Sequence, residues 1–209
     1  MKTNLYDRQR SLGLNIPPKV AIIGVGGVGA WCALNFALTG TKEIFLIDDD
    51  ILEEHNLNRT PFKRSQIGKT KVVAMTELII ERRIDAKVMP IPLKIENLDK
   101  NLFDKIKNAE IIDCRDTSEV LPEGLKSKIT GGYNGISITL HVNPEPGKVW
   151  TAIENQGYTI TPSYLVPPVI IAALITDFII GNYQLDKDEF ETFNLNEILP
   201  MILGRKKTN

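Results

Sequence analysis

The most constraining feature of this chain is an apolar run that leads directly into a cluster of glycines, Val20-Ala-Ile-Ile-Gly24-Val-Gly26-Gly-Val-Gly29. The apolar run is typical of a buried strand, and the residues after the glycines suit a helix. Glycines at such a junction allow a tight turn and let the backbone approach a ligand. The free N–H groups and the dipole of the helix then favour a negative charge. The run therefore predicts a phosphate-binding turn, with Gly24, Gly26, Gly27 and Gly29 as candidate positions.

A second apolar run, Glu43-Ile-Phe-Leu-Ile-Asp48, ends in an acid. An acid about twenty residues beyond a glycine loop suits hydrogen bonding between its carboxylate and ribose hydroxyls. The alternative is a glycine-rich turn that binds nothing. The strand, the helix and the spaced acid together favour a nucleotide site.

Strand and helix patterns alternate through the first half of the chain. Strands are predicted at 19–25, 43–48, 87–93 and 109–114, and helices at 27–39, 70–85 and 98–107. Such alternation implies parallel strands, so we expect an α/β, Rossmann-like, doubly wound fold with a mainly parallel sheet. The segment 49–68 is polar, and its Asn56, Asn58 and Pro61 disfavour regular structure.

The second half has a different pattern. Strand is predicted over 128–142 and again at 148–153, which suits an antiparallel extension of the sheet. A loop at 154–164 and a final helix that begins near Pro167 and Pro168 follow. We therefore expect one domain over 1–209, made of an N-terminal helical arm (1–18), a nucleotide-binding core (19–117) and a C-terminal part (118–209).

Composition excludes several classes of protein. The net charge of −1 gives no general attraction to nucleic acid or membranes. Two cysteines make neither a disulfide scaffold nor a zinc cluster. The N-terminus lacks a hydrophobic signal core. The longest apolar stretch, 164–180, is interrupted by Pro167, Pro168, Thr176 and Asp177, so a buried helix is expected rather than a membrane span. A cytoplasmic protein is expected.

Charged side chains form an ordered set around these elements. Arg8 lies in the arm, Arg59 in the polar segment and Lys71 at the start of a predicted helix. Asp48 and Asp116 each follow a predicted strand, at the edge where doubly wound sheets bind ligands. Taken singly, surface cations are usually solvated, and an acid such as Asp116 is often a helix cap. Their joint occurrence favours a site.

In order and spacing, these residues resemble the ThiF/MoeB/HesA family, whose fold is that of the ubiquitin-activating enzymes. The resemblance is strong over 5–117 and weaker to about residue 181. The matching elements are Arg8-Gln9, Gly24 to Gly29, Asp48 and Asp50, Asn56 and Arg59, Lys71, and Asp113-Cys114-Arg115-Asp116.

The resemblance implies a nucleotide-binding domain that dimerises, here as a homodimer, and that uses ATP with Mg²⁺. The usual reaction of the family is adenylation of a C-terminal carboxylate, most often the Gly-Gly tail of a ubiquitin-like or sulfur-carrier protein. The carboxylate attacks the α-phosphate, and pyrophosphate leaves. Charge stabilisation by magnesium and basic side chains suits such chemistry.

The same resemblance assigns roles to individual residues. The Gly26 to Gly29 backbone would let the nucleotide approach, and Asp48, with Asp50 beside it, would hold the ribose. Arg59 and Lys71 would hold phosphates, and Arg8 would reach the phosphates of the neighbouring subunit. Asp116 would bind magnesium, and Asn56 would support the site.

The chain also departs from the family. Many members hold a structural zinc in two CxxC pairs, and none occurs here, so no zinc is expected. Many carry a catalytic cysteine before the last helix, whereas 154–164 has none. Cys32 and Cys114 suit the core. The acyl group is therefore expected to pass from the adenylate to a thiol, sulfide, amine or hydroxyl of another molecule.

Hydroxyl residues before the last helix are other candidate acceptors for the acyl group. The hydroxyls of Tyr158, Thr161 and Ser163 would need an activating base to form an ester, and no histidine lies near them in sequence. His55 is expected at the rim of the nucleotide site, and His141 is expected to be structural. The segment between Asp116 and Gly131, which helps to shape the tail groove in the family, is short.

Three alternatives remain open. A relative of this type would activate a small-molecule or tRNA-attached carboxylate, as in cyclising dehydration of a modified tRNA adenosine, although the near-neutral charge disfavours nucleic acid. A non-catalytic ATP-binding subunit would pair with a separate catalytic chain. A nicotinamide dehydrogenase would have no use for Arg59, Lys71 and Asp116.

Overall fold

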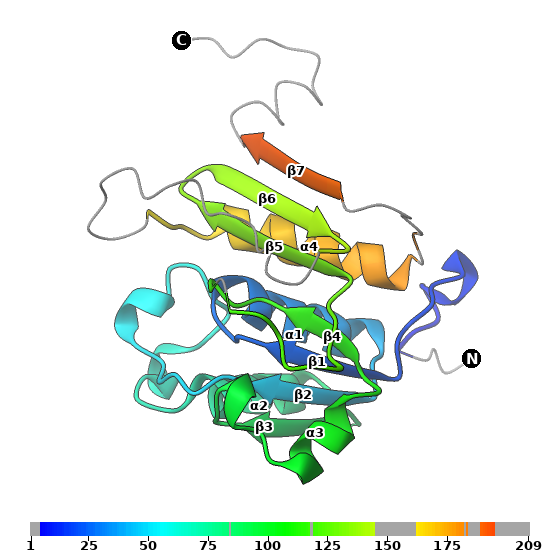
Figure 1. Ribbon diagram of the computed structural model, residues 1–209, viewed down its shortest axis with the longest axis horizontal. Coiled ribbons are helices and arrows are strands. Elements are labelled where there is room, and N and C mark those ends of the chain that lie inside the picture. Colours follow the sequence, from blue (N-terminus) through cyan, green and yellow to red (C-terminus); the bar gives the residue numbers. More distant parts are fainter. Residues whose placement is uncertain are drawn as a thin grey trace.

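The computed structural model describes residues 5–83, 85–117, 119–144, 162–181, 183 and 189–194. Its main sheet holds four parallel strands in the order β3-β2-β1-β4 (Figure 1). These are β1 Lys19–Ile23, β2 Glu43–Ile47, β3 Lys87–Ile91 and β4 Glu110–Asp113. The predicted parallel strands are confirmed, and each ends one or two residues earlier than its sequence pattern suggests. For β1 the reason is Gly24, where a φ of 83° turns the chain.

Helices cover both faces of this sheet, as the predicted doubly wound fold requires. The helices α1 Gly27–Thr39 and α2 Lys71–Arg82 pack on the face that includes Ile22 and Leu46. The helix α3 Lys100–Ile106 packs on the opposite face, which includes Ile23 and Ile47. Alternate side chains of a strand point to opposite faces, so strands covered on both sides must be apolar throughout.

Two helix boundaries differ from the predicted ones for local reasons. α3 begins at Lys100 because the Asp99 side chain accepts a hydrogen bond from the N–H of Leu102 and so caps the helix. α2 ends at Arg82 because Arg83 leaves the helical conformation, with φ −147° and ψ 87°. The segment 49–68 is irregular, as predicted, apart from 3-10 helices at Glu54–Asn56 and Arg64–Gln66, and another lies at Ile95–Asn97.

The strands of the second half form a sheet of their own. They are β5 Ile129–Asn134, β6 Ser137–Val142 and β7 Glu189–Asn194, all antiparallel. The predicted strand 128–142 is in fact a hairpin, which turns at Gly135 with a φ of 58°. Antiparallel strands are thus confirmed, but they form a separate sheet, and in the described chain one backbone bridge, between Ile111 and Ser127 just before β5, links it to the main sheet. β7 was not predicted, and the predicted strand 148–153 lies outside the described residues.

The long helix α4 Val166–Ile180 joins the two sheets (Figure 1). It begins beside Pro167 and Pro168, as predicted. Asn35 of α1 donates a hydrogen bond to the Thr176 hydroxyl at 3.3 Å, so α4 packs on α1. Its other side presses on β5, where a side chain on Gly131 would lie 2.6 Å from Ile171. Among the described residues, no helix has both the length and the apolar character needed to cross a bilayer.

The described part of the arm is mostly turns, with one 3-10 helix at Arg10–Leu12 in place of the predicted helical arm. Gln9 donates a hydrogen bond to the Thr39 carbonyl at 2.6 Å, which ties the arm to the end of α1. Arg83 lies over the ring of Tyr6, 5.4 Å from its centre. These contacts place the arm beside the amino ends of β1 and β2.

Candidate functional site

A cleft of about 800 Å³ opens at the carboxyl ends of the parallel strands. Because β2 and β4 flank β1 and the chain reverses its direction of winding there, this edge is the switch point at which doubly wound sheets bind ligands. Most of the predicted site residues line the cleft, namely Gly24, Gly26, Gly27, Asp48, Asp50, Asn56, Arg59, Lys71 and Asp116. Gly29 and Arg8 do not.

The glycines at the start of α1 serve different purposes. At Gly24, a side chain would lie 3.1 Å from the backbone of Cys114 and Arg115, at the end of β4. At Gly29, a side chain would lie 1.8 Å from the Gly24 carbonyl oxygen, so this glycine lets helix and turn pack together. A side chain on Gly26 would meet nothing within 4 Å. Gly26 is therefore the position where the backbone is open to a ligand.

Asp48 lies at the end of β2 and faces the glycine loop. Its carboxylate accepts hydrogen bonds from the N–H of Val25 at 2.6 Å and from the N–H of Asp50 at 2.8 Å. Burial raises the pKa of Asp48, and the charge of Lys71 and the two backbone donors offset part of this effect. The carboxylate is thus fixed in orientation at the side of the cleft.

Lys71 is the first residue of α2 and brings a positive charge into the cleft. Its ammonium nitrogen lies 2.5 Å from the Asp50 carboxylate. The Lys71 side chain is only 11% exposed, whereas that of Asp50 is 65% exposed. The cation is therefore the buried member of the pair, and it faces a cleft in which a phosphate would supply a second anionic partner.

Arg59 enters the cleft from the polar segment between β2 and α2. Its guanidinium donates to the His55 carbonyl at 2.7 Å, and Trp31 of α1 donates to the Arg59 carbonyl at 3.0 Å. Asn56 is buried, and its side chain accepts from the N–H of Glu53. Asn56 thus stabilises the turn that carries Arg59, which fits the supporting role expected of it.

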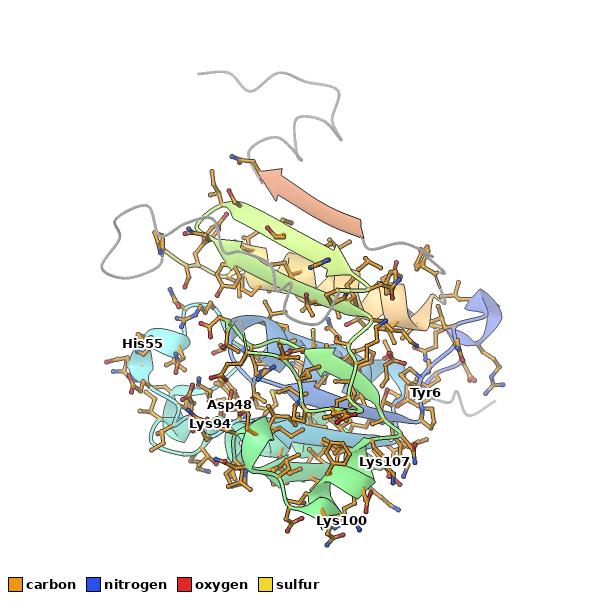
Figure 2. The ribbon with its side chains drawn as sticks, in the orientation of Figure 1. Tyr6, Asp48, His55, Lys94, Lys100 and Lys107 are labelled. Carbon is orange, nitrogen blue, oxygen red and sulfur yellow. The ribbon has the colours of Figure 1, made fainter. Side chains whose placement is uncertain are left out.

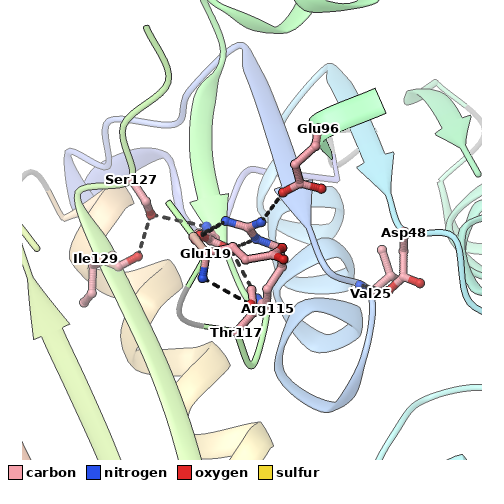
Figure 3. A network of polar contacts seen from close by, with 9 residues as sticks. Val25, Asp48, Glu96, Arg115, Thr117, Glu119, Ser127 and Ile129 are labelled. Carbon is pink, nitrogen blue, oxygen red and sulfur yellow. Dashed lines mark hydrogen bonds and ion pairs between the residues drawn. The ribbon is translucent and has the colours of Figure 1, made fainter. Parts of the chain in front are cut away.

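Asp116 lies just beyond β4 and is exposed at the cleft. Its neighbour Arg115 donates to both carboxylate oxygens of Asp113, at 3.0 and 3.1 Å, and to Glu96 at 2.7 Å (Figure 3). Burial acts to lower the pKa of Arg115, but the hydrogen bonds with Asp113 and the charges of Asp113 and Glu96 outweigh burial and raise this pKa.

In the described residues from 117 to 128 no helix begins, so the alternative of a helix cap at Asp116 is wrong.

Several residues that the sequence did not single out also line the cleft. Glu96 and Lys94 come from the 3-10 turn after β3, and Tyr133 comes from β5. Ser163, one of the hydroxyl residues considered from sequence, lines the cleft from the segment before α4. Burial raises the pKa of Tyr133, whose hydroxyl forms hydrogen bonds with the side chains of Arg59 and Ser163. A tyrosine in a strand gives no functional signal by itself, because aromatic residues are common in strands.

Arg8 lies away from the cleft of its own chain. It is exposed on the arm, whose Gln9 is bonded to the far end of α1. Figure 2 shows Tyr6 of the arm on the opposite side of the molecule from Asp48 and His55. The structure therefore does not bring Arg8 together with the other candidate residues, and a role for it at the site of a second subunit stays a prediction.

The two cysteines and two histidines differ in their burial and in their distance from the cleft. Cys32 is buried, whereas Cys114 is half-buried and lines the cleft. A hydrogen bond with Cys32, and then burial, raise the pKa of Cys114 well above its usual range, which makes it a weak nucleophile at neutral pH. His55 lines the cleft as expected, and His141 is buried in β6.

Oxygen ligands suited to a divalent cation are available in the cleft. Among the described residues, one group of three acids, Asp48, Asp49 and Asp50, brings carboxylate oxygens within 4.8 Å of one another. Asp48 is already bonded to backbone N–H groups and Asp50 to Lys71. The carboxylate of Asp116 has no ion-pair partner among the described residues. Carboxylates and water are the ligands that magnesium prefers.

Two curated relatives are similar in sequence to part of this chain. A "NEDD8-activating enzyme E1 catalytic subunit" of Dictyostelium discoideum is 34% identical over 142 residues, which cover 59% of this chain and 32% of the relative. An "adenylyltransferase and sulfurtransferase UBA4" of Debaryomyces hansenii is 34% identical over 101 residues, 47% of this chain and 22% of the relative. The chain thus spans a third or less of the length of these relatives.

Solved structures show the same fold. The E. coli MccB structure with ATP has a TM-score of 0.60 at 24% identity, covering 85% of this chain and 63% of that chain. The PaaA structure has a TM-score of 0.62 at 23% identity, covering 85% and 64%. The ThiF family model matches residues 14–121, more than half of the sequence and the whole parallel sheet. The chain belongs to the ThiF family.

Proposed function

We propose that this protein is an ATP-dependent adenylyltransferase that activates a carboxylate as an acyl-adenylate. The observation that carries the proposal is that one cleft joins an open glycine loop, a fixed acid at the end of β2, and the cations Arg59 and Lys71. A nucleotide needs this combination, because its ribose is a hydrogen-bond donor and its phosphates are anionic.

In the proposed reaction, a carboxylate oxygen of the substrate attacks the α-phosphorus of ATP. The bond from that phosphorus to the oxygen bridging to the β-phosphate breaks, and pyrophosphate leaves. Arg59 and Lys71 neutralise phosphate charge, and the backbone at Gly26 allows close approach. Asp48 orients the nucleotide by accepting hydrogen bonds from ribose hydroxyls.

Magnesium would be held by Asp116, and when bound it would neutralise charge on the triphosphate. The exposed carboxylate of Asp116 beside the cleft fits an oxygen-seeking cation that also keeps bound water. The neighbouring Arg115 is not free to neutralise phosphate charge, because its guanidinium is paired with Asp113 and Glu96. These ion pairs fix the backbone that carries Asp116.

The substrate we propose is the C-terminal Gly-Gly tail of a ubiquitin-like or sulfur-carrier protein, activated by a homodimer in which Arg8 completes the partner's site. The names of the two relatives, a NEDD8-activating enzyme and an adenylyltransferase and sulfurtransferase, support this substrate class. No thioester step on this chain is proposed, since Cys32 is buried and the pKa of Cys114 is raised.

ATP–pyrophosphate exchange with and without carrier proteins ending in Gly-Gly tests the proposal. We expect exchange that requires a carrier, fails when its tail is removed, and falls at least about a hundredfold in Arg59→Met and Asp116→Asn. Arg64→Met and Asp104→Asn are matched controls, because both side chains form exposed ion pairs outside the cleft. Full exchange in either cleft variant would contradict the assigned roles. ATP binding without exchange for any carrier would favour a small-molecule or tRNA-attached carboxylate, or a subunit that awaits a partner.

A further inference from the structure

The hydroxyl of Tyr133 lies at the start of α1, although Tyr133 belongs to the second sheet. A side chain added to Gly27 would lie 2.6 Å from this hydroxyl oxygen. Gly27 is the first residue of α1, and no side chain caps that helix end. The ring of Tyr133 packs against the main hydrophobic core, so β5 and this packing hold the hydroxyl beside Gly27.

The hydroxyl is also joined to Arg59. Tyr133 forms side-chain hydrogen bonds with Arg59 and Ser163, and all three residues line the cleft. A guanidinium can only donate, so the Tyr133 oxygen accepts from Arg59 and keeps its own proton for another acceptor. Asn58 donates a hydrogen bond to the Ser163 carbonyl at 3.1 Å, which fixes the segment that carries Ser163.

We propose that Tyr133 is a catalytic residue of this cleft, whose hydroxyl is held by Arg59 and donates a hydrogen bond to a phosphate oxygen of the bound nucleotide. The inference rests on the proposed function, because it requires a nucleotide whose phosphates face the start of α1. Arg59 and Ser163 both act to lower the pKa of Tyr133, as groups that donate to its oxygen do. The hydroxyl proton therefore remains available for the phosphate, whose charge makes it a strong acceptor.

The surroundings suit a donor rather than a base. Burial raises the pKa of Tyr133, so the hydroxyl keeps its proton at neutral pH. During attack on the α-phosphorus, negative charge gathers on the phosphate oxygens, and a fixed neutral donor strengthens its bond as that charge grows. Tyr133 would thus orient Arg59 and stabilise the phosphate with one hydroxyl group, without gaining or losing its proton.

Binding of ATP and of adenosine to the full chain separates this role from a structural one. We expect Tyr133→Phe to weaken ATP binding about tenfold, the effect of losing one hydrogen bond to a charged group, and to leave adenosine binding unchanged. Tyr183→Phe is the matched control, since its hydroxyl contacts Asp177 outside the cleft. In a double variant with Arg59→Met, the further loss from Tyr133→Phe should be under about twofold, because the two groups act together.

The outcomes are distinguishable. Equal ATP affinity in Tyr133→Phe and the wild type would overturn the inference while leaving the proposed function intact. Parallel loss of ATP and adenosine binding would also overturn it, because only a structural defect affects both ligands. Wild-type protein that binds no ATP would overturn the proposed function, and this inference with it.

Discussion

The carboxylate of Asp48 accepts a hydrogen bond from the N–H of Val25 at 2.6 Å, which ties the end of β2 to the glycine loop that leaves β1. The same carboxylate accepts from the N–H of Asp50 at 2.8 Å. Two neighbouring strand ends are therefore held in register by one side chain. The acid organises the cleft before any ligand arrives.

Asp48 should make nucleoside binding dependent on pH. Burial raises its pKa, so the carboxyl group takes up a proton at a higher pH than an ordinary aspartate does. Only the ionised group accepts hydrogen bonds through both oxygens, so adenosine affinity should fall as pH drops through this raised pKa. Titration of adenosine binding from about pH 7 to about pH 4 measures the effect, because adenosine itself carries no phosphate to titrate.

The control for this titration is Asp48→Asn, which should bind adenosine about tenfold more weakly near neutral pH. Its affinity should not change over the same range. A pH profile identical in wild type and variant would exclude Asp48 as the titrating group. For stability the sign is the reverse: protonated Asp48 is favoured by burial, so its contribution to stability declines as pH rises through its pKa.

Gly27→Ala should destabilise the fold by about 1–3 kcal/mol, the usual effect of overpacking. The new methyl group would lie 2.6 Å from the Tyr133 hydroxyl. Adding Tyr133→Phe removes that oxygen, so the double variant should recover most of the lost unfolding free energy in urea. Gly29→Ala is the contrasting variant, since its methyl group would meet the Gly24 backbone at 1.8 Å and no side-chain change relieves it. No recovery in the first double variant would show that Tyr133 does not limit Gly27.

Arg115→Met should lower the unfolding free energy by about 2–3 kcal/mol. The carboxylates of Asp113 and Glu96 and the carbonyl of Glu119 would each lose the hydrogen bond that Arg115 donates. The Arg115 side chain is 13% exposed. Glu96→Gln removes a single, more exposed partner and should cost under about 1 kcal/mol. Urea denaturation of both variants measures the difference. Equal stability of the two would mean that the bonds to Asp113 contribute little.

Arg83→Met should loosen the arm as well as the domain. Arg83 is buried, donates to the carbonyls of Ala37 and Thr41 at 2.6 Å, and lies over Tyr6. We expect about 3 kcal/mol of destabilisation and faster proteolysis in the arm. The adjacent Arg82 is exposed, so Arg82→Met should change stability by under about 0.5 kcal/mol. Unchanged cleavage in Arg83→Met would show that the contact between Arg83 and Tyr6 does not hold the arm.

Much of the parallel half could be predicted because its signals are local. α1 has the predicted bounds, since Gly26 and Gly40 flank it and mark both ends. The meeting of Asp48 and Asp116 in the cleft also followed from sequence, because parallel strands end at one edge of a sheet. The place of Lys71, at the start of α2, was expected from the family resemblance.

The antiparallel half was harder because its signals are long-range. Asn134-Gly135 is a turn signal that would have split the predicted strand 128–142 into its hairpin. β7 exists through pairing with β6, which no local pattern records. Tyr133 was missed because its meeting with Gly27 depends on α4 packing between β5 and α1.

In the described part of the chain, one backbone bridge, from Ile111 to Ser127 just before β5, links the main sheet to the second sheet, so side-chain packing does most of the joining. Residues of both sheets line the cleft, so a molecule that fills it would contact both. Binding energy then adds to the side-chain packing among α1, α4 and β5 that already joins the two sheets. Occupancy should therefore slow amide hydrogen exchange in β5 and β6 as well as in β1 and β2. Because both sheets share one hydrophobic core, the empty and the loaded protein should each unfold in a single stage, and the ligand should raise the midpoint of that transition.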